Sequence, residues 1–181
     1  MAYTQRRPDA PKTGRTVRLG GGQVVPYPEP TSAAATTIGR ANRRVDSRAE
    51  VALRCALHHL GLRFRVDPLV RAEGTKTHPD IVFGPVRLAV FVDGCFWHCC
   101  PAHIHMPKSN LAYWEPKLAA NVVRDRRVDQ ALVADGWSVL RVWEHERVEV
   151  AVRAVVDALI ELGHEPADRA RSVLGTTDPE Q

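Results

Sequence analysis

The chain has 181 residues, of which 44% are hydrophobic, and its formal net charge is +4. This length and composition favour one globular domain with its own core. No run approaches the ~18 apolar residues of a membrane span, and no apolar stretch follows the N-terminal arginines as a secretory signal requires. The four cysteines are too few and too clustered for a disulfide framework, so we expect metal binding in a reducing cytoplasm.

Positive charge is concentrated near the N-terminus. Residues 1–44 carry eight Arg or Lys against two Asp or Glu, a formal charge of +6, whereas the remainder sums to −2. Residues 1–37 are rich in Pro, Gly, Ser, Thr and Ala without any period, which predicts a disordered basic extension. Such an arm favours a polyanionic partner, with nucleic acid as the expected one and a merely solvated tail as the alternative.

The first clear helix is predicted to begin after Ser47. Ser47 suits the N-cap, Glu50 completes a capping box three residues later, and Gly61 ends the helix. Residues 62–66 alternate as a strand does, and residues 67–78 read as a polar loop. Apolar runs at residues 81–83 and 86–92, separated by a Gly-Pro turn, predict two further strands.

Helices and strands alternate in the rest of the chain. We predict a helix from Pro116 to about residue 134, a strand over residues 137–143, a helix over residues 147–162 and a disordered tail over residues 164–181. Strand, helix and strand make a βαβ unit, so the fold class is α/β, with helices on both faces of a mixed sheet. Asn121 and Asp125 fall on the buried side of the long helix, which indicates a site; a solvated charged face is the alternative for Asp125.

Metal-type ligands are crowded after the strand at residues 86–92. Cys95, Cys100 and His103 can reach one point from a single loop, and His145, just after the last strand, is the best fourth ligand for a tetrahedral zinc ion. Cys99 is the rival of Cys100, but the two-residue spacer between Cys100 and His103 is the usual chelate step. Ordinary buried thiols and a redox dithiol are the alternatives; adjacent cysteines weaken the second.

Two carboxylates flank the neighbouring strands. Asp80 precedes the strand at residues 81–83, and Asp93 ends the strand at residues 86–92. Nucleases hold magnesium with hard oxygen ligands of this kind. Simple hairpin pairing places Asp80 opposite Ala89, so a shared site with Asp93 requires a bend or bulge. A polar residue at a loop end is the alternative for Asp80.

At this point the chain resembles the very-short-patch-repair (Vsr) DNA mismatch endonucleases. The matching motifs run in order from about residue 37 to residue 146, and the segment Gly-Cys-Phe-Trp-His is the most specific of them. The motifs are PDIV at 79–82, FVDGCFWH at 91–98, PKSN at 107–110, YW at 113–114, NVVRDRR at 121–127 and GWSVLRVWE at 136–144.

The resemblance implies a restriction-endonuclease-like fold with a structural zinc ion and a magnesium-dependent active site, here over residues 38–163. Family members nick the thymine strand 5′ to the T of a T:G mismatch left by 5-methylcytosine deamination. It also implies a monomer in the bacterial cytoplasm, associated with the nucleoid when bound to double-stranded DNA, with mismatch-repair proteins as candidate partners.

Roles carry over by position. Asp80 would be the central magnesium ligand, with the main-chain carbonyl of Val92 as a second contact, and His98 would be the general base. Glu50 and Asp125 would support the metal waters and the histidine. The chain departs from common family patterns in three respects, the third being that the methionine some members insert into DNA from the N-terminal arm falls near Gly39 here. Asp93 stands where a histidine is common and could add a metal ligand; His103 and His145 stand where cysteines are common, and two Cys with two His still close a zinc site.

The resemblance also implies DNA contacts. Phe96, Trp97 and Trp114 match aromatic residues that wedge into the duplex beside the mismatch, with core packing as the alternative for any single ring. Lys108, Arg40 and Arg43 are candidate phosphate contacts. Two rival functions remain: a related strand nuclease of a restriction or phage-defence system, and a non-catalytic, zinc-stabilised DNA-binding module.

Overall fold

The computed structural model describes residues 16–18, 24–26 and 46–175 of the chain. Strands β1 (Thr16–Arg18) and β2 (Val24–Pro26) pair antiparallel within the extension predicted to be disordered. The rest of residues 1–45, and residues 176–181, lie outside the described part. The predicted DNA contacts of Arg40 and Arg43 lie there and stay predictions.

A four-stranded mixed sheet forms the centre of the fold. Strand β7 is antiparallel to β6, which is antiparallel to β3, whereas β8 runs parallel to β7. Helix α3 connects β7 to β8, so the predicted βαβ unit is confirmed. The order across the sheet is β3 (Arg65–Val66), β6 (Ile81–Phe83), β7 (Leu88–Asp93) and β8 (Ser138–Trp143).

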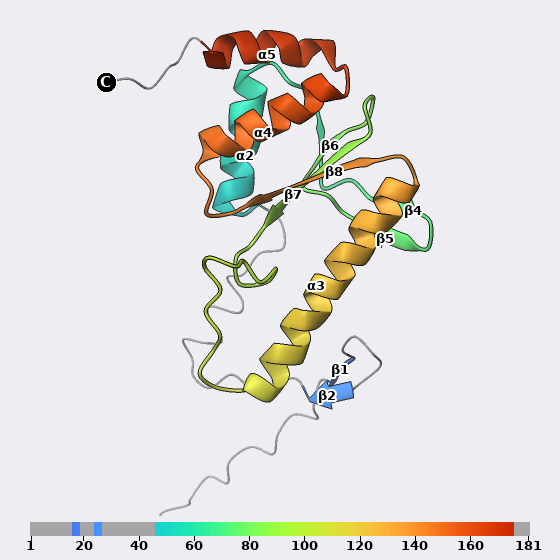
Figure 1. Ribbon diagram of the computed structural model, residues 1–181, viewed down its shortest axis with the longest axis vertical. Coiled ribbons are helices and arrows are strands. Elements are labelled where there is room, and N and C mark those ends of the chain that lie inside the picture. Colours follow the sequence, from blue (N-terminus) through green and yellow to red (C-terminus); the bar gives the residue numbers. More distant parts are fainter. Residues whose placement is uncertain (1–15, 19–23, 27–45, 176–181) are drawn as a thin grey trace, which may run out of the picture.

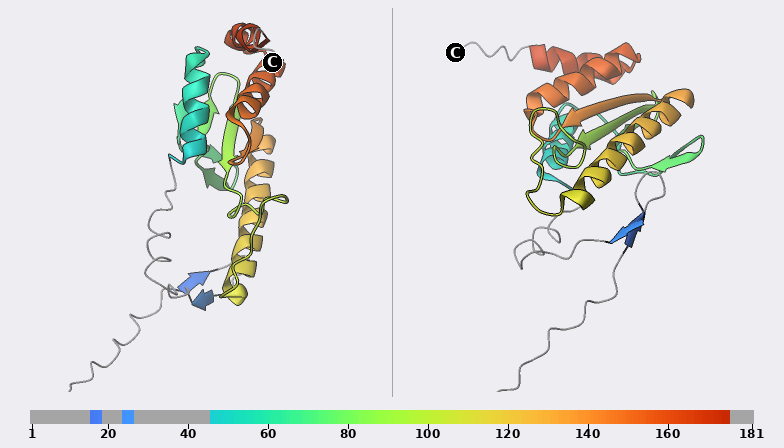
Figure 2. Two further views of the ribbon diagram at one scale, coloured as in Figure 1. Left: turned by 90° about the vertical axis from the view of Figure 1, so that its left-hand side faces the viewer. Right: turned by 60° about the horizontal axis from the view of Figure 1, so that its bottom comes forward.

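Helices cover both faces of this sheet, as predicted (Figure 1). The larger core lies on one face, where α2 (Arg48–His59), α4 (Val148–Glu161) and α5 (Glu165–Gly175) pack against alternate strand residues such as Ile81 and Val90. On the other face, α3 (Leu111–Ala134) places Val128 and Leu132 against Val82 and Phe91. The right-hand view of Figure 2 shows α4 and α5 above β8 and α3 below it.

The N-terminus of α2 is capped as predicted. The Ser47 hydroxyl accepts a hydrogen bond from the backbone N–H of Glu50 at 3.2 Å. The Glu50 carboxylate turns back and accepts from the backbone N–H of Asp46 at 2.9 Å. Glu50 is only 5% exposed, so this carboxylate lies inside the fold at the helix start.

Helix α3 is longer than predicted at its N-terminal end. It begins at Leu111 and contains Pro116. Pro116 has no N–H to donate to the carbonyl of Ala112, a loss that the end of a helix tolerates better than its middle. No described helix combines the length and apolar character needed to cross a lipid bilayer.

Two predictions of irregular structure are wrong. The predicted polar loop at residues 67–78 contains a hairpin of β4 (Val70–Ala72) and β5 (Thr75–Thr77). The predicted disordered tail begins instead with helix α5, which buries Ala167 and Ala170 against the larger core. Both segments bury few and small apolar side chains, so their sequence periods are weak.

The turn between β6 and β7 corrects the predicted register. Residues 84–87 form the turn: Arg87 has φ +52° and its N–H donates to the carbonyl of Gly84 at 3.2 Å. Strand β7 therefore starts at Leu88, and Ile81 pairs with Val90. This longer turn moves Asp80 two residues further along β7, opposite Phe91 rather than Ala89.

Candidate functional site

The carboxyl ends of β7 and β8 meet at a cavity of about 380 Å³ between the start of α2 and the first half of α3. Parallel strands end at the same edge of a sheet, which is why residues distant in sequence gather here. The lining includes three of the predicted catalytic or metal-binding residues, Glu50, Val92 and His98, and the predicted wedge residue Trp97. The full lining is Ser47, Glu50, Val92, Gly94, Trp97, His98, Lys117, Asn121, Arg124 and Glu144.

Asp80 does not itself line the cavity but is bonded to Val92, which does. The backbone N–H of Val92 donates to Oδ2 of Asp80 at 2.7 Å. Burial raises the pKa of Asp80 to about 6; the Val92 N–H opposes this shift, while the nearby carboxylates of Glu50 and Asp93 add to it. A cation bound beside Asp80 would favour its ionised form and relieve this repulsion.

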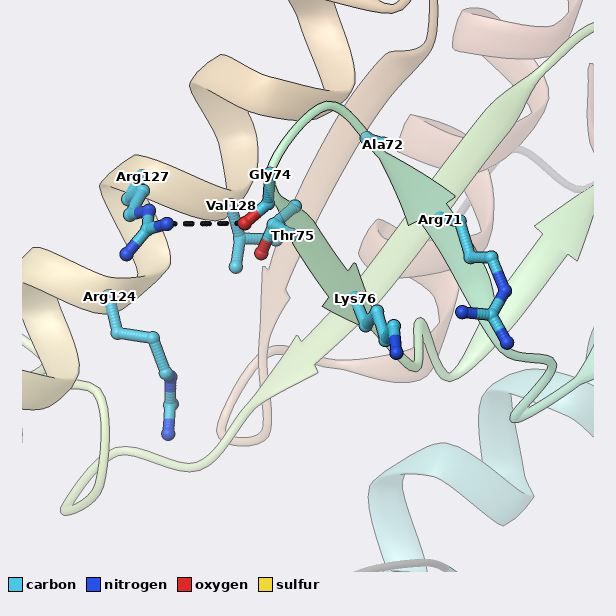
Figure 3. A pocket seen from close by; sticks show the side chains of 8 residues that line it. All are labelled: Arg71, Ala72, Gly74, Thr75, Lys76, Arg124, Arg127 and Val128. Carbon is cyan, nitrogen blue, oxygen red and sulfur yellow. Dashed lines mark hydrogen bonds between the residues drawn. The ribbon is translucent and has the colours of Figure 1, made fainter.

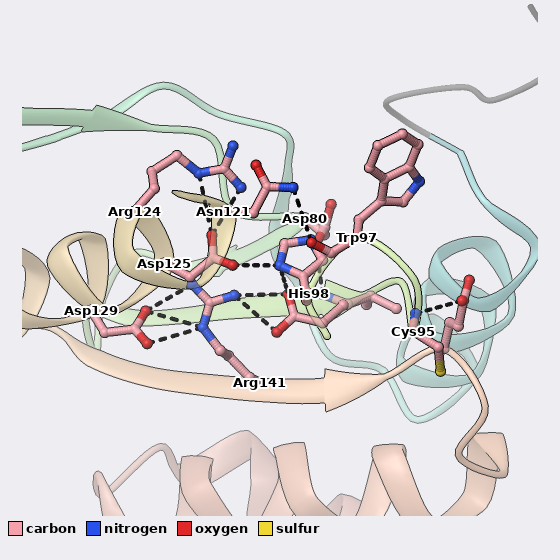
Figure 4. A network of polar contacts seen from close by, with 12 residues as sticks. Asp80, Cys95, Trp97, His98, Asn121, Arg124, Asp125, Asp129 and Arg141 are labelled. Carbon is pink, nitrogen blue, oxygen red and sulfur yellow. Dashed lines mark hydrogen bonds and ion pairs between the residues drawn. The ribbon is translucent and has the colours of Figure 1, made fainter. Parts of the chain in front are cut away.

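His98 is oriented by a carboxylate of α3. Its Nδ1 lies 2.6 Å from Oδ2 of Asp125, and 3.5 Å from Oδ1 of Asp93 (Figure 4). A proton on Nδ1 that is donated to Asp125 leaves the lone pair on Nε2. His98 lines the cavity, so this arrangement provides a base where a water molecule or substrate can reach it.

Asp125 is ionised more readily than an ordinary aspartate. Burial by itself would raise its pKa, but hydrogen bonds from His98 and Arg124 lower it below the usual value. Arg124 donates to Oδ1 of Asp125 at 2.9 Å, and His98 contacts Oδ2. The predicted inward position of Asp125 thus has a structural reason, because both carboxylate oxygens are held by partners.

Asp93 lies in a different environment from the one predicted. The carboxylate is 5% exposed and accepts hydrogen bonds from Arg141 at 2.8 and 3.0 Å. Arg141 also donates to Asp129 at 2.8 Å and lies over the ring of Phe91. Burial alone would lower the pKa of Arg141, but the hydrogen bonds and charges of Asp129 and Asp93 raise it above its ordinary value. Asp93 is therefore engaged by a permanent cation.

We expect Arg141→Met to destabilise the fold by roughly 2–4 kcal/mol, because it leaves the buried Asp93 carboxylate without its cation. This expected loss of stability is smaller than the loss for a fully buried ion pair, because the Arg141 side chain is 22% exposed. Urea unfolding measures the change. The control is Arg147→Met, whose ion pair with Glu149 joins side chains that are 83% and 67% exposed, and should cost less than about 0.5 kcal/mol. Equal effects would contradict the assignment.

The four predicted zinc ligands lie together. The Sγ atom of Cys95 is 3.0 Å from Nδ1 of His145, and Sγ of Cys100 is 3.7 Å from Nδ1 of His103. One ligand atom from each residue lies within 4.8 Å of the other three, so the cluster could hold a metal ion. These separations suit ligands that share one tetrahedral ion. Cys99 does not belong to the group.

Burial raises the pKa of the Cys95 thiol to about 11, and the neighbouring Cys100 adds to this shift. Without a cation, the Cys95 thiol would stay protonated at neutral pH. A metal ion supplies the charge that favours the thiolate. The donor set of two sulfurs and two imidazoles therefore fits a soft or borderline divalent ion.

The loop between β7 and α3 is wound into overlapping turns over residues 94–104. His98 N–H donates to the carbonyl of Gly94, Cys100 N–H to that of Cys95, and Ile104 N–H to that of Cys100. Two side chains from other elements fasten it. Glu144 accepts from the backbone N–H of Cys95 at 2.6 Å, and Asn121 donates to the carbonyl of Trp97 at 3.0 Å.

Three aromatic side chains gather beside the cavity. The ring centroids of Phe96 and Trp114 are 5.3 Å apart, and those of Phe96 and Trp97 are 5.0 Å apart. All three rings are partly exposed rather than buried in a core, and Trp97 lines the cavity. The structure thus groups the three predicted wedge residues. Lys108 is exposed on the loop that precedes α3 and is not among the residues that line this cavity.

Sequence reasoning missed Arg141, Asp129, Glu144 and Lys117. Arg141 gave one usable signal, because a lone arginine inside an otherwise apolar strand needs a buried carboxylate as partner. Its partner Asp93 ends the neighbouring parallel strand. The other three depend on how α3 and β8 sit against the loop.

Comparison with known proteins gives a consistent result. The family model described as DNA mismatch endonuclease Vsr matches residues 31–103. The type II nicking enzyme V.NaeI of Lentzea aerocolonigenes is 53% identical over 139 residues, which cover 76% of this chain and 84% of that relative. The type II nicking enzyme V.XorIIP of Xanthomonas oryzae pv. oryzae is 45% identical over 121 residues, covering 64% and 86%. The DNA mismatch endonuclease Vsr of Escherichia coli is 36% identical over 100 residues, covering 55% and 62%.

An acid and histidine site at the edge of a mixed sheet, together with these relatives, defines a DNA endonuclease. The chain belongs to the Vsr family. The resemblance stated from its motifs is thereby confirmed, and the alternative of a non-catalytic DNA-binding module is set aside.

Proposed function

We propose that this enzyme uses magnesium to nick double-stranded DNA 5′ to the T of T:G mismatches produced by 5-methylcytosine deamination. The fold would be of the restriction-endonuclease type, and the enzyme would act as a monomer. The observation that carries the proposal is one cavity edge at which Asp80, Val92 and the His98–Asp125 pair meet, beside three partly exposed aromatic rings.

Asp80 and the main-chain carbonyl of Val92 would hold the magnesium ion. When bound, the ion supplies positive charge to the scissile phosphate and to the leaving oxygen. The Val92 N–H fixes Oδ2 of Asp80, so the carboxylate already has a set orientation. Glu50, buried at the start of α2, would orient water molecules of the metal.

His98 would take a proton from the attacking water at Nε2. Asp125 keeps Nδ1 protonated and fixes the ring, and it stabilises the imidazolium that forms. Because Arg141 donates to the Asp93 carboxylate, Asp93 would help to position His98 rather than bind the metal directly.

The Cys95, Cys100, His103 and His145 cluster would hold zinc as a structural ion. These four residues would supply all four ligands of a tetrahedral ion and would leave no open position for a substrate. Its function would be to hold the loop that carries His98 and the aromatic side chains.

Phe96, Trp97 and Trp114 would enter the duplex beside the mismatch. Unstacking a base step costs a few kcal/mol, and a T:G wobble pair resists deformation less than a Watson–Crick pair. Discrimination would thus come from the cost of opening the step as well as from direct contacts.

The test uses a labelled duplex with one T:G mismatch, a matched T:A control and magnesium. The expected product is a single nick 5′ to the mismatched T, with the matched duplex intact and the complementary strand uncut. Equal cutting of both duplexes would overturn mismatch specificity, and cutting without divalent metal would overturn the role of magnesium.

We expect Asp125→Asn to lower the nicking rate on the order of 10⁴-fold, as loss of the carboxylate that orients a general-base histidine does elsewhere. The amide cannot stabilise an imidazolium, and it fixes the wrong tautomer when its N–H faces Nδ1. Single-turnover nicking measures the rate, and duplex affinity in magnesium-free buffer should change little. The matched control is Asp157→Asn on α4, whose ion pair with Arg171 is exposed. Unchanged nicking in Asp125→Asn would contradict the base assignment.

A strand nuclease that serves a restriction or phage-defence system is the second candidate. Several relatives carry the name type II nicking enzyme, which favours it. It predicts nicking set by a recognition sequence, with little dependence on the mismatch. Duplexes that vary the flanking bases around T:G and T:A pairs separate the two functions.

A further inference from the structure

A second cavity, of about 530 Å³, lies between the β4–β5 hairpin and helix α3. Figure 3 shows arginine and lysine side chains on both of its walls. Its lining consists of Arg71, Ala72, Gly74, Thr75, Lys76, Arg124, Arg127 and Val128. We call it the basic cleft.

On each wall of the basic cleft, two cationic side chains lie close enough to repel each other. Arg71 and Lys76 are directly opposite each other in the β4–β5 register, and like charges in that position destabilise a hairpin. Arg124 and Arg127 are three residues apart on α3, where like charges also repel. Two repelling pairs facing one space are not explained by packing.

Little within the described part of the chain offsets this charge. The lining of the cleft contains no Asp or Glu, and the described residues include no ion-pair partner for Arg71 or Lys76. Arg127 donates to the carbonyl of Gly74 at 3.2 Å, which fastens the hairpin to the helix and keeps the two walls facing each other. The cleft is thus arranged for an anion that the described residues do not provide.

Arg124 connects the basic cleft to the candidate active site. Its side chain lines both cavities, and its guanidinium bonds to Asp125, the partner of His98. A polyanion lying in the cleft would therefore continue into the cavity where the strand is cut. A row of phosphates spaced along a backbone fits this continuity better than a single small anion does.

We propose that the basic cleft binds the sugar–phosphate backbone of duplex DNA on one side of the nicked position, with Arg71 and Lys76 as phosphate contacts. The inference rests on the proposed DNA-cutting function and adds a binding surface to it. Such contacts carry no sequence information, so they add affinity equally to matched and mismatched DNA.

The test compares the zinc-containing full chain with Arg71→Gln/Lys76→Gln. Binding to the T:G duplex and to its T:A control is measured without magnesium at several salt concentrations. Each lost phosphate contact lowers the slope of log affinity against log salt by about 0.9, so we expect a slope smaller by about 2 and affinity about 10-fold weaker at roughly 150 mM salt. Both duplexes should lose the same factor. The variant should melt no lower than wild type, because a repelling pair has been removed.

The matched control is Arg153→Gln/Arg169→Gln, which removes two exposed cations from α4 and α5 on the other side of the sheet. It should leave both slope and affinity unchanged. An unchanged slope in Arg71→Gln/Lys76→Gln, a loss equal to that of the control, or a loss confined to the mismatched duplex would each overturn the proposal. Wild-type protein that binds DNA in this way but never nicks it would overturn the proposed function and leave the cleft assignment standing.

Discussion

Replacement of Asp80 by Asn should abolish nicking, with a loss of about a thousandfold or more, while the protein stays folded. Without this carboxylate the magnesium ion loses its central ligand, and the charge that it brings to the phosphate is worth several kcal/mol. Single-turnover nicking of the T:G duplex measures the loss. The amide oxygen of Asn can still accept from the Val92 N–H, so the local geometry has a substitute partner.

The same variant should be more stable than wild type in magnesium-free buffer at pH 7. Because burial raises the pKa of Asp80 to about 6, its ionised form is disfavoured in the folded state, and Asn removes that cost. The stability that protonation of Asp80 gives wild type is complete below the unfolded pKa of about 4 and is lost as the pH rises through about 6. The advantage of Asp80→Asn should therefore shrink as the pH falls from 7 to 4.

The control is Asp135→Asn, which removes an aspartate paired with Arg87 at the other end of the sheet. It should keep full nicking activity. Substantial nicking by Asp80→Asn in magnesium would show that another residue holds the metal.

Loss of the sulfur of Cys100 should remove the proposed zinc ion and lower the melting temperature by roughly 10 °C or more, a destabilisation of several kcal/mol. Cys100 is 1% exposed, so Cys100→Ser leaves a buried hydroxyl that cannot replace the thiolate. Nicking should fall with metal content although Asp80 and His98 are unaltered, because the loop that carries His98 depends on the cluster. Elemental analysis and thermal melts measure both effects.

Two cysteine variants make this experiment specific. Cys55→Ser changes an exposed thiol on α2 and should have no effect. Cys99→Ser changes the neighbouring thiol, which the structure leaves outside the cluster, and should keep about one zinc ion per chain. Zinc loss in Cys99→Ser but not in Cys100→Ser would reverse the ligand assignment, and a stable, metal-free wild type would remove it.

Most of the fold could be predicted from sequence patterns among neighbouring residues. The Ser47 cap, the continuous apolar runs of β6 and β7 and the periodic apolar face of α4 depend on residues close in sequence, so they can be predicted without knowing the fold. The grouping of Cys95, Cys100 and His103 was accessible for the same reason, since one loop supplies all three.

What could not be predicted depends on distant contacts. Helix α5 holds its place by Ala167 and Ala170 fitting against α4, and alanines give little signal in sequence. The position of Asp80 depends on a four-residue turn in which Arg87 adopts a positive φ. This conformation is usual for Gly or Asn, and neither residue stands at position 87 to indicate it. The Asp93–Arg141–Asp129 network joins two strands and a helix, and so required the register of β8 against β7.

The winding of residues 94–104 divides the long connection before α3 into two parts with different tolerance to changes in length. Each turn in this winding spans a fixed number of residues, so one inserted or deleted residue between Cys95 and His103 would rotate His98 or a ligand of the cluster away from its partners. Residues 105–109 carry none of these backbone bonds among the described contacts. A change in length should therefore be tolerated better in that second part than in the winding itself.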